Sequence, residues 1–241
     1  MGGDGSADEA RRGLRRGRGS VSFSRTTSGS SSTPLSSTKL VSRPGFANFL
    51  LFGVTSVELA LLLVLTPTFT ITDWIYVLQN LLVLGIALLR RAPGLQDCSM
   101  ASGAAIIVAY AYPYGELLYL RWMPGEPAWP EAGLVLVTLA ACLSLSSLLT
   151  LGRRFGVRPA VRGLATGGPY RIVRHPMYLA YMLADVGYNL QEWNSGTVLL
   201  VVAGWMSLFY RIRAEERMLA HDPGWPSYTA RVRHRLVPRV W

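Results

Sequence analysis

Long apolar segments separated by short polar connections fill the chain after residue 45. There are six of these segments, at residues 46–66, 74–89, 101–120, 132–151, 177–190 and 196–212. A helix needs about 20 apolar residues to cross the hydrocarbon core of a bilayer, and the first, third and fourth segments reach that length. The fifth and sixth are shorter and are joined by the polar sequence QEWNS. They therefore predict a tilted or partly submerged helical hairpin.

This pattern predicts an all-α fold, a polytopic integral membrane helical bundle of about six transmembrane helices. A large soluble helical bundle is the alternative, but soluble core helices rarely stay apolar on every face over such lengths. Residues 1–44 are rich in Ser, Gly and Arg and cannot bury enough apolar surface to fold alone, so we predict a disordered tail. Residues 45–131 then form N-terminal transmembrane helices, and residues 132–241 form the core with a cytoplasmic C-terminal tail.

Positive charge is concentrated on alternate connections. The chain has 24 Lys and Arg against 14 Asp and Glu, and Lys39 is its one lysine. All of these cations except Arg121 fall before residue 45, in the connections 90–99 and 152–175, or after residue 210. This positive-inside distribution predicts cytoplasmic termini, and it explains the basic composition through topology and anionic membrane lipids, without nucleic acid. The predominance of Arg is typical of a GC-rich genome but does not identify the organism. A bacterial inner membrane and the endoplasmic reticulum both have a cytoplasmic face for the basic connections, and of the two we expect the bacterial inner membrane.

The cysteines and histidines do not indicate a metal centre. Cys98 and Cys142 are isolated in the sequence. The three histidines, His175, His221 and His234, have no spacing typical of metal ligands. We therefore predict no metal and no disulfide framework.

Three carboxylates interrupt the apolar segments: Glu58, Glu116 and Asp185. Ionisable side chains within a membrane span are costly and indicate a functional site by default. For Glu58 and Glu116 the alternative is a group near an interface, or one that is protonated or paired. Asp185 and Asn189 are four residues apart and share a helix face, which we predict to face the interior of the bundle.

The sequence YRIVRHPMYLAYM marks the start of the fifth segment. Pro176 suits the first turn of a helix because it lacks an amide proton, and this places His175 at the cap. Free amides at a helix N-terminus, together with Arg171 and Arg174, predict a site for an anionic or carboxylate-bearing group. The alternative is that the proline only begins the helix and the arginines only set the membrane topology.

The sequence RIRAEERML follows the last apolar segment. Arg211 and Glu215 share a helix face, and Glu216 lies beside them. Taken alone, this sequence is typical of a solvated helix extension with one weak salt bridge. The short connection between the last two helices, however, predicts that residues 170–178 and 211–216 lie close together. Paired acidic and basic side chains beside an apolar cavity can hold a zwitterionic ligand.

Together these motifs resemble a known family. The sequence LGRRFGVRPAVRGLATGGPYRIVRHPMY, followed about 35 residues later by RIRAEE and then YTARVRHRLVP, is similar to the isoprenylcysteine carboxyl methyltransferases and the related phospholipid N-methyltransferases. The resemblance covers roughly residues 132–241 and rests on RHPxY combined with a Glu pair at this spacing. It implies a membrane methyltransferase core that uses S-adenosylmethionine, with a lipophilic or lipidated acceptor and membrane lipids as partners.

The resemblance also implies roles for particular residues. The family's cofactor-contacting positions correspond to Tyr170, His175, Pro176, Met177, Tyr178 and Glu215, with Glu216 beside it, and its adenosine-lining stretch corresponds to Arg162, Gly163, Leu164 and Ala165. These residues would make the C-terminal helical hairpin the cofactor pocket. The predicted catalytic residues are Arg211, which matches the family's substrate-contacting arginine, Arg174, which adds positive charge, and Asp185, which would serve as base for an amine acceptor.

Two departures from the family pattern bear on the reaction. Phospholipid N-methyltransferases carry a GxG motif that VTLAACLSLSSLL lacks, although its small residues Ala140, Ala141, Ser144 and Ser147 still allow close helix packing. Phe155 stands where eukaryotic isoprenylcysteine enzymes have a polar cofactor contact. We predict carboxyl O-methylation of an isoprenylcysteine-like or other lipidic carboxylate. The alternatives are N-methylation of a phospholipid or another amine, an NADPH-dependent enzyme like the sterol reductases, and a non-catalytic membrane scaffold. No oligomeric state is predicted.

Overall fold

A computed structural model describes residues 38–40, most of 53–64, residue 69, and residues 71–89, 95–156 and 158–238. The predicted tail therefore lies outside the described residues except for 38–40, and Glu58 lies outside them as well. Every described residue between 53 and 64 is helical, within the first apolar segment.

The described residues are mostly helical, as the apolar pattern predicts. The named helices are α3 (Ile71–Leu89), α4 (Met100–Trp122), α5 (Pro130–Leu151), α6 (Pro176–Gln191), α7 (Ser195–Leu219) and α8 (Trp225–Arg231). The helices α3 to α7 begin within a few residues of the second to sixth predicted segments. The last of these, α7, has 25 residues and is longer than the sixth apolar segment. It is longer because the polar sequence RIRAEERML continues the same helix past the apolar segment.

Local signals in the sequence account for several helix starts. The Ser99 hydroxyl accepts a hydrogen bond from the Ser102 amide at 3.2 Å before α4, and the Asn194 side-chain oxygen accepts one from the Gly196 amide at 2.8 Å before α7. Such caps satisfy amides that have no partner within the helix. α6 begins at Pro176, which needs no partner for an amide proton.

Two short strands pair near one end of the helices. They are β1 (Thr38–Leu40) and β2 (Leu95–Asp97), in antiparallel register. The sequence predicts no strand, because three residues are too few to show an alternating pattern. β2 also holds the long connection between α5 and α6, since the Asp97 amide donates to the Pro159 carbonyl at 3.0 Å. That connection carries residues 162–165, the predicted adenosine-lining stretch.

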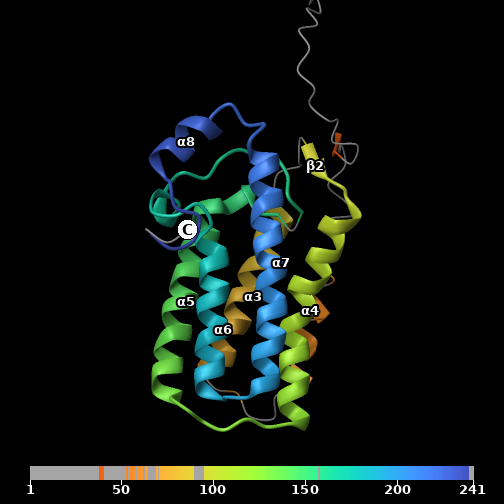
Figure 1. The fold of residues 1–241 in the computed structure, drawn as a ribbon, viewed down its shortest axis with the longest axis vertical. Helices are drawn as coiled ribbons and strands as arrows, with labels where there is room; N and C mark the ends of the chain where they lie inside the picture. Colours follow the sequence, from red (N-terminus) through yellow and green to blue (C-terminus); the bar gives the residue numbers. More distant parts are fainter. Residues whose placement is uncertain are drawn as a thin grey trace, which may run out of the picture. The chain divides into compact units, whose positions relative to one another are not determined.

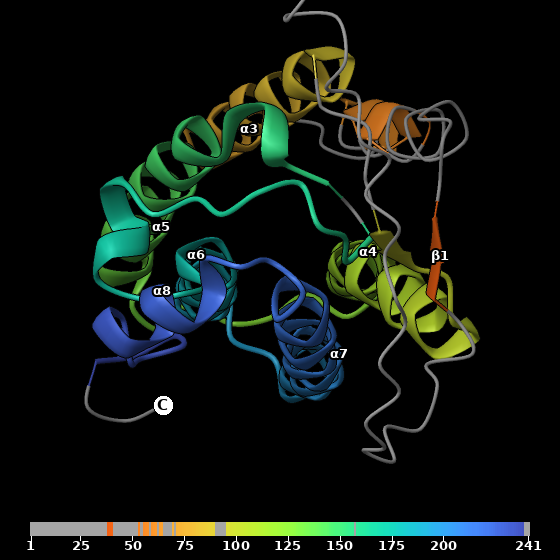
Figure 2. The same ribbon diagram turned by 90° about the horizontal axis from the view of Figure 1, so that it is seen from above.

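The long helices run side by side (Figures 1 and 2). α6 packs mainly on α5, α7 packs mainly on α4, and α3 packs on α5. α6 and α7, the predicted hairpin, make few backbone contacts with each other, so long side chains bridge them. α8 and the connection 152–175 lie at one end of the helices, which we call the α8 end (Figure 1). The connections 123–129 and 192–194 lie at the opposite end.

α5 and α6 approach each other closely at two glycines. A Cβ atom added to Gly187 would lie 2.7 Å from Val137 Cγ2 and 2.9 Å from the Gly133 carbonyl oxygen. Further along α5, the small residues Ala140 and Ser144 are buried. Small side chains let two helix backbones approach and increase their van der Waals contact. This close contact holds the end of α6 against the start of α5.

Replacing Gly187 with Val tests this interface. We expect a loss of about 2 kcal/mol in stability, because the new side chain overlaps α5 and cannot be relieved by a flexible neighbour. Gly85→Val in α3 is the matched control, since a Cβ added to Gly85 meets nothing within 4 Å. Thermal unfolding in detergent measures both variants. Equal losses in the two would show that helix propensity, and not packing, is responsible.

The outer surface of the helices is suited to lipid. Among the described residues, two helices are long and apolar enough to cross a membrane, Pro130–Arg154 and Ser195–Leu219. Side chains such as Leu139, Leu199 and Met206 are 59%, 73% and 69% exposed, which is costly in water and favourable in a hydrocarbon environment. These helices support a location in a membrane.

Candidate active site

A cavity of about 400 Å³ connects the predicted site residues. Its volume falls within the range usual for small-molecule pockets. Side chains from α3, α4, α5, α6, α7 and α8 line it, together with the connection between α5 and α6. The predicted residues that line it are Arg162, Gly163, Leu164, Ala165, Tyr170, Arg174, His175, Met177, Tyr178, Asp185, Arg211 and Glu215. Pro176 and Glu216 are not among the lining residues.

The start of α6 is held by the C-terminal segment. The Arg174 amide donates to the His234 carbonyl and the His175 amide donates to the Arg235 carbonyl, both at 2.9 Å. The amides of Arg174 and His175 are therefore occupied by backbone carbonyls and are not available to an anion. The sequence could not show this, because the partners lie about 60 residues further along the chain. The consequence is a rigid corner between α6 and the end of the chain.

Glu216 is the centre of an ion-pair cluster in this corner. One of its oxygens lies 2.8 Å from Arg174 Nη1 and 3.4 Å from His175 Nε2, and the other lies 2.9 Å from Arg235 Nε. The Glu216 side chain is only 12% exposed, so these pairs are shielded from solvent. Both oxygens are thus engaged with protein groups, and Glu216 ties α7 to α6 and to the C-terminal segment.

Replacing Glu216 with Gln should loosen the C-terminal segment. The variant leaves Arg174 and Arg235 without their shared carboxylate, and losing hydrogen bonds to a charged group costs about 2 kcal/mol. We expect amide hydrogen exchange at residues 232–236 to become about tenfold faster or more. The control is Asp222→Asn, which removes a carboxylate from a nearby turn outside this cluster. Unchanged exchange at 232–236 would show that backbone hydrogen bonds alone hold the segment.

Glu215 and Arg211 lie one helix turn apart on α7 and both face the cavity. The Tyr178 hydroxyl donates a hydrogen bond to Glu215, and His175 Nδ1 lies 3.8 Å from the other carboxylate oxygen. The Arg211 guanidinium lies over the rings of Tyr178 and Tyr110, 5.4 Å and 5.8 Å from their centroids. The two predicted clusters, RHPMY and RIRAEE, therefore meet at one wall of the cavity, with an acidic and a basic side chain side by side.

A second group of arginines lines the cavity, and we call it the basic wall. Its members are Arg154, Arg158 and Arg162 of the connection between α5 and α6. The Arg162 guanidinium donates to the Arg158 carbonyl at 3.3 Å and lies against Gly156, where an added Cβ would come within 2.5 Å of it. Gly163 has a φ of +90°, which favours glycine there. The sequence analysis missed Arg154 and Arg158 because loop arginines were explained by membrane topology.

Two tyrosines close the α8 end of the cavity. The Tyr228 hydroxyl, on α8, donates to the Tyr170 carbonyl at 2.9 Å. Burial raises the pKa of Tyr228 to about 12 and raises the pKa of Tyr170 well above its ordinary value, so both stay protonated at neutral pH. α8 thereby remains fixed over the connection that carries the basic wall.

Asp185 lies in the same cavity but away from this corner. It accepts hydrogen bonds from Trp205 Nε1 at 2.8 Å and from the Tyr112 hydroxyl at 3.0 Å. Seven residues separate it from Tyr178 along α6, which corresponds to about 10 Å of helix. The structure therefore brings Arg211, Glu215 and Tyr178 together and places Asp185 deeper between the helices.

Comparison with known proteins finds a family that is similar to this region. The sequence model of the phospholipid methyltransferase family matches residues 130–222. This part of the chain is similar to that family of membrane methyltransferases. The matched range contains α5, α6, α7 and the basic wall, whereas α8 and the C-terminal segment that holds the start of α6 follow it. The resemblance inferred from the sequence motifs is thereby confirmed.

A curated relative of this methyltransferase family carries a related name. The chain is 29% identical over 93 residues to protein-S-isoprenylcysteine O-methyltransferase A of Arabidopsis thaliana. The alignment covers 36% of this chain and 47% of the relative, so it spans about half the length of that protein. α3 and α4, which supply one side of the cavity, precede the range matched by the family model.

Proposed function

We propose that this protein is an integral membrane enzyme that transfers the methyl group of S-adenosylmethionine to a carboxylate of a lipophilic acceptor. The observation that carries the proposal is the buried Arg211 guanidinium, 6% exposed, which faces the cavity beside Glu215. The planar fork of this guanidinium matches the two oxygens of a carboxylate. The neighbouring corner holds the residue types that a zwitterionic cofactor requires.

The residues present fit S-adenosylmethionine. Glu215 supplies a carboxylate for its amino group, and the basic wall supplies cations for its carboxylate. Arg154 Nε is buried without a hydrogen-bond partner among the described residues, which is costly unless a ligand accepts from it. Leu164 and Trp225 line the cavity and offer apolar surface for the adenine ring. Arg162, Gly163, Ala165, Tyr170, His175, Pro176, Met177, Tyr178 and Glu216 would hold or support this pocket.

In this proposal the protein acts by positioning. When bound, S-adenosylmethionine supplies an electrophilic methyl group on a positively charged sulfur. A carboxylate acceptor has no proton to lose, so no general base is required. Arg211 orients the acceptor carboxylate, Arg174 adds positive charge at the rim, and the rings of Tyr110 and Tyr178 fix the Arg211 fork from two sides. Apolar helix surfaces exclude water from the site and strengthen these charge interactions.

An amine acceptor is the second candidate, and the family name favours it. Such a reaction needs a base, and Asp185 is the carboxylate that could serve. The proposed topology has about six transmembrane helices with both termini in the cytoplasm. Under that topology the cofactor enters from the cytoplasm at the α8 end, and the lipophilic acceptor enters between helices. The family match supports either methyltransferase over a nicotinamide-dependent reductase.

One labelling experiment tests the proposal. Membranes containing the full chain are incubated with methyl-labelled S-adenosylmethionine and one of three acceptors: an isoprenylated N-acetylcysteine, a long-chain fatty acid, or an aminophospholipid. Methyl esters release methanol in mild alkali, whereas N-methyl groups stay bound. We expect labelled, alkali-labile product from one of the acids. Alkali-stable label on the aminophospholipid would establish the amine candidate, and label on no acceptor would contradict the proposal.

A further inference from the structure

Two carboxyl groups in the cavity take no part in methyl transfer to a carboxylate. They are Glu116 of α4 and Asp185 of α6, which are 9% and 8% exposed and both line the cavity. Asn189, one turn beyond Asp185, donates to Glu116 Oε1 at 2.8 Å, so the two carboxyls lie at neighbouring depths. Both lie towards the opposite end of the helices from α8. Burying a carboxylate costs free energy unless hydrogen-bond donors or a cation replace the water that it loses. The partners of each carboxyl therefore show whether a cation is already present.

The hydrogen-bond partners of these carboxyls are neutral. Asp185 accepts from Tyr112 and Trp205, and Glu116 accepts from Asn189, whose own side-chain oxygen accepts from Thr197 at 2.7 Å. Among the residues that the structure describes, no ion pair joins either carboxyl to a cation. An anionic site within a membrane is costly without a counter-charge. Two such carboxyls beside open cavity space are therefore suited to a cationic ligand.

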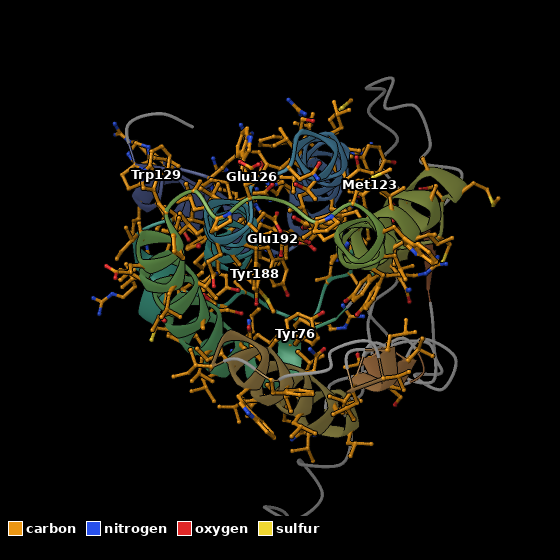
Figure 3. The ribbon with its side chains drawn as sticks, turned by 90° about the horizontal axis from the view of Figure 1, so that it is seen from below. Tyr76, Met123, Glu126, Trp129, Tyr188 and Glu192 are labelled. Atoms are coloured by element: carbon orange, nitrogen blue, oxygen red, sulfur yellow. The ribbon has the colours of Figure 1, made fainter. Side chains whose placement is uncertain are left out.

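The aromatic surroundings provide a second, independent indication. Tyr76, Tyr112, Tyr114 and Tyr188 line the cavity at this depth, and the hydroxyls of Tyr76 and Tyr114 lie 3.3 Å apart. Figure 3 shows Tyr76 on α3 and Tyr188 on α6 directed towards the space between the helices. The faces of aromatic rings carry partial negative charge and attract organic ammonium groups. Tyrosine rings combined with carboxylates are a recurrent way to bind such groups.

The charges of the cavity are separated along its length. The arginines that line it, Arg154, Arg158, Arg162, Arg174 and Arg211, belong to its α8 end. Asp185 lies seven residues beyond Tyr178 along α6, and Asn189, which contacts Glu116, lies eleven residues beyond it. The two carboxyls are therefore about 10 to 16 Å from the level of Tyr178. A ligand with a carboxylate at one end and an ammonium group at the other would align with this separation.

We propose that Glu116, Asp185 and the four tyrosines form an ammonium subsite for the acceptor. The acceptor would be an amphiphilic acid that carries an organic ammonium group about 10 to 16 Å from the carboxylate held by Arg211. This inference rests on the proposed function, because it assumes that the carboxylate end is the end to be methylated. Such a subsite would favour an acid with an ammonium group over an acid whose chain is wholly apolar.

The test measures binding of ω-amino fatty acids to the full chain in lipid nanodiscs by calorimetry. Acids of about eight to twelve carbons span the proposed separation, and the unsubstituted fatty acid of each length is the matched ligand. We expect each ω-amino fatty acid to bind about tenfold more tightly than the unsubstituted fatty acid of the same length. Glu116→Gln and Asp185→Asn should each remove most of this advantage while changing the affinity for the unsubstituted acids less than about twofold.

Two controls separate the ammonium subsite from a general effect of charge and from binding in the cofactor corner. Glu131→Gln removes an exposed carboxylate of α5 outside the cavity and should leave the advantage intact. The titrations are repeated with saturating S-adenosylhomocysteine, and loss of the advantage there would place the probe in the cofactor corner and overturn the proposal. Equal affinity for ω-amino and unsubstituted fatty acids would also overturn the proposal. So would a loss of affinity for both kinds of acid alike in Glu116→Gln and Asp185→Asn.

Failure of the proposed function would look different. If the ammonium advantage persists but no acid is methylated, the subsite stands and the carboxylate reaction fails. If acids are methylated but no ammonium advantage exists, the reaction stands and the subsite fails. Retained binding of S-adenosylhomocysteine by Glu116→Gln and Asp185→Asn shows that the variants are folded.

Discussion

Replacing Glu215 with Gln is expected to weaken binding of S-adenosylmethionine by about 10- to 150-fold. Glu215 is the carboxylate of the cavity corner that remains available, because Glu216 is occupied by Arg174 and Arg235. A hydrogen bond to a charged group contributes about 1.5 to 3 kcal/mol, and each 1.4 kcal/mol is a factor of ten in affinity. Calorimetric titration of the purified protein in detergent measures the change.

The fold should tolerate this change. Gln has nearly the same shape and still accepts the hydrogen bond from the Tyr178 hydroxyl, so thermal stability should change little. The Glu131→Gln variant controls for loss of one negative charge, and it should bind the cofactor normally. Cofactor affinity that is the same in Glu215→Gln and the unaltered protein would remove Glu215 from the cofactor pocket.

Replacing Arg211 with Ala should reduce turnover by about 100- to 1,000-fold. The Arg211 side chain is buried, lines the cavity and lies over the rings of Tyr110 and Tyr178, so its fork is pre-positioned for an acceptor carboxylate. Losing one preorganised donor typically costs this much in the rate of an enzyme. Because Glu215 and the basic wall remain, affinity for the cofactor should be preserved. Initial rates at saturating cofactor, over a range of acceptor concentrations, give kcat and KM separately.

Arg211→Lys tests whether the planar fork matters. Lysine keeps the positive charge but presents it as a point, so it cannot hold both oxygens of a carboxylate in one geometry. We expect an intermediate loss of turnover in this variant, between the unaltered protein and Arg211→Ala. Full turnover in Arg211→Ala, with normal cofactor binding, would exclude Arg211 from acceptor positioning. Loss of both turnover and cofactor binding in Arg211→Ala would show that the side chain supports the whole corner.

The local sequence pattern was sufficient to predict the helices and the types of residue where the start of α6 meets the end of α7. The apolar segments predicted α3 to α7, and Pro176 predicted the start of α6, because these features depend on neighbouring residues alone. Spacing along α7 also placed Arg211 and Glu215 on one face, since side chains four apart in a helix point the same way. The RHPMY and RIRAEE motifs led to the methyltransferase family, which the comparison confirmed over residues 130–222.

Packing between distant segments decided which partners the side chains on these helix faces meet. The sequence treats Glu215 and Glu216 as a pair, yet only the folded chain brings Arg174 and Arg235 to Glu216 and leaves Glu215 facing the cavity. Likewise, Glu116 appears in the sequence as a single acid in an apolar helix, and Asn189, its partner, is 73 residues away. Periodicity determines the direction of a side chain relative to its own helix. Which helix it meets depends on long-range contacts, and these have no signature in a local pattern.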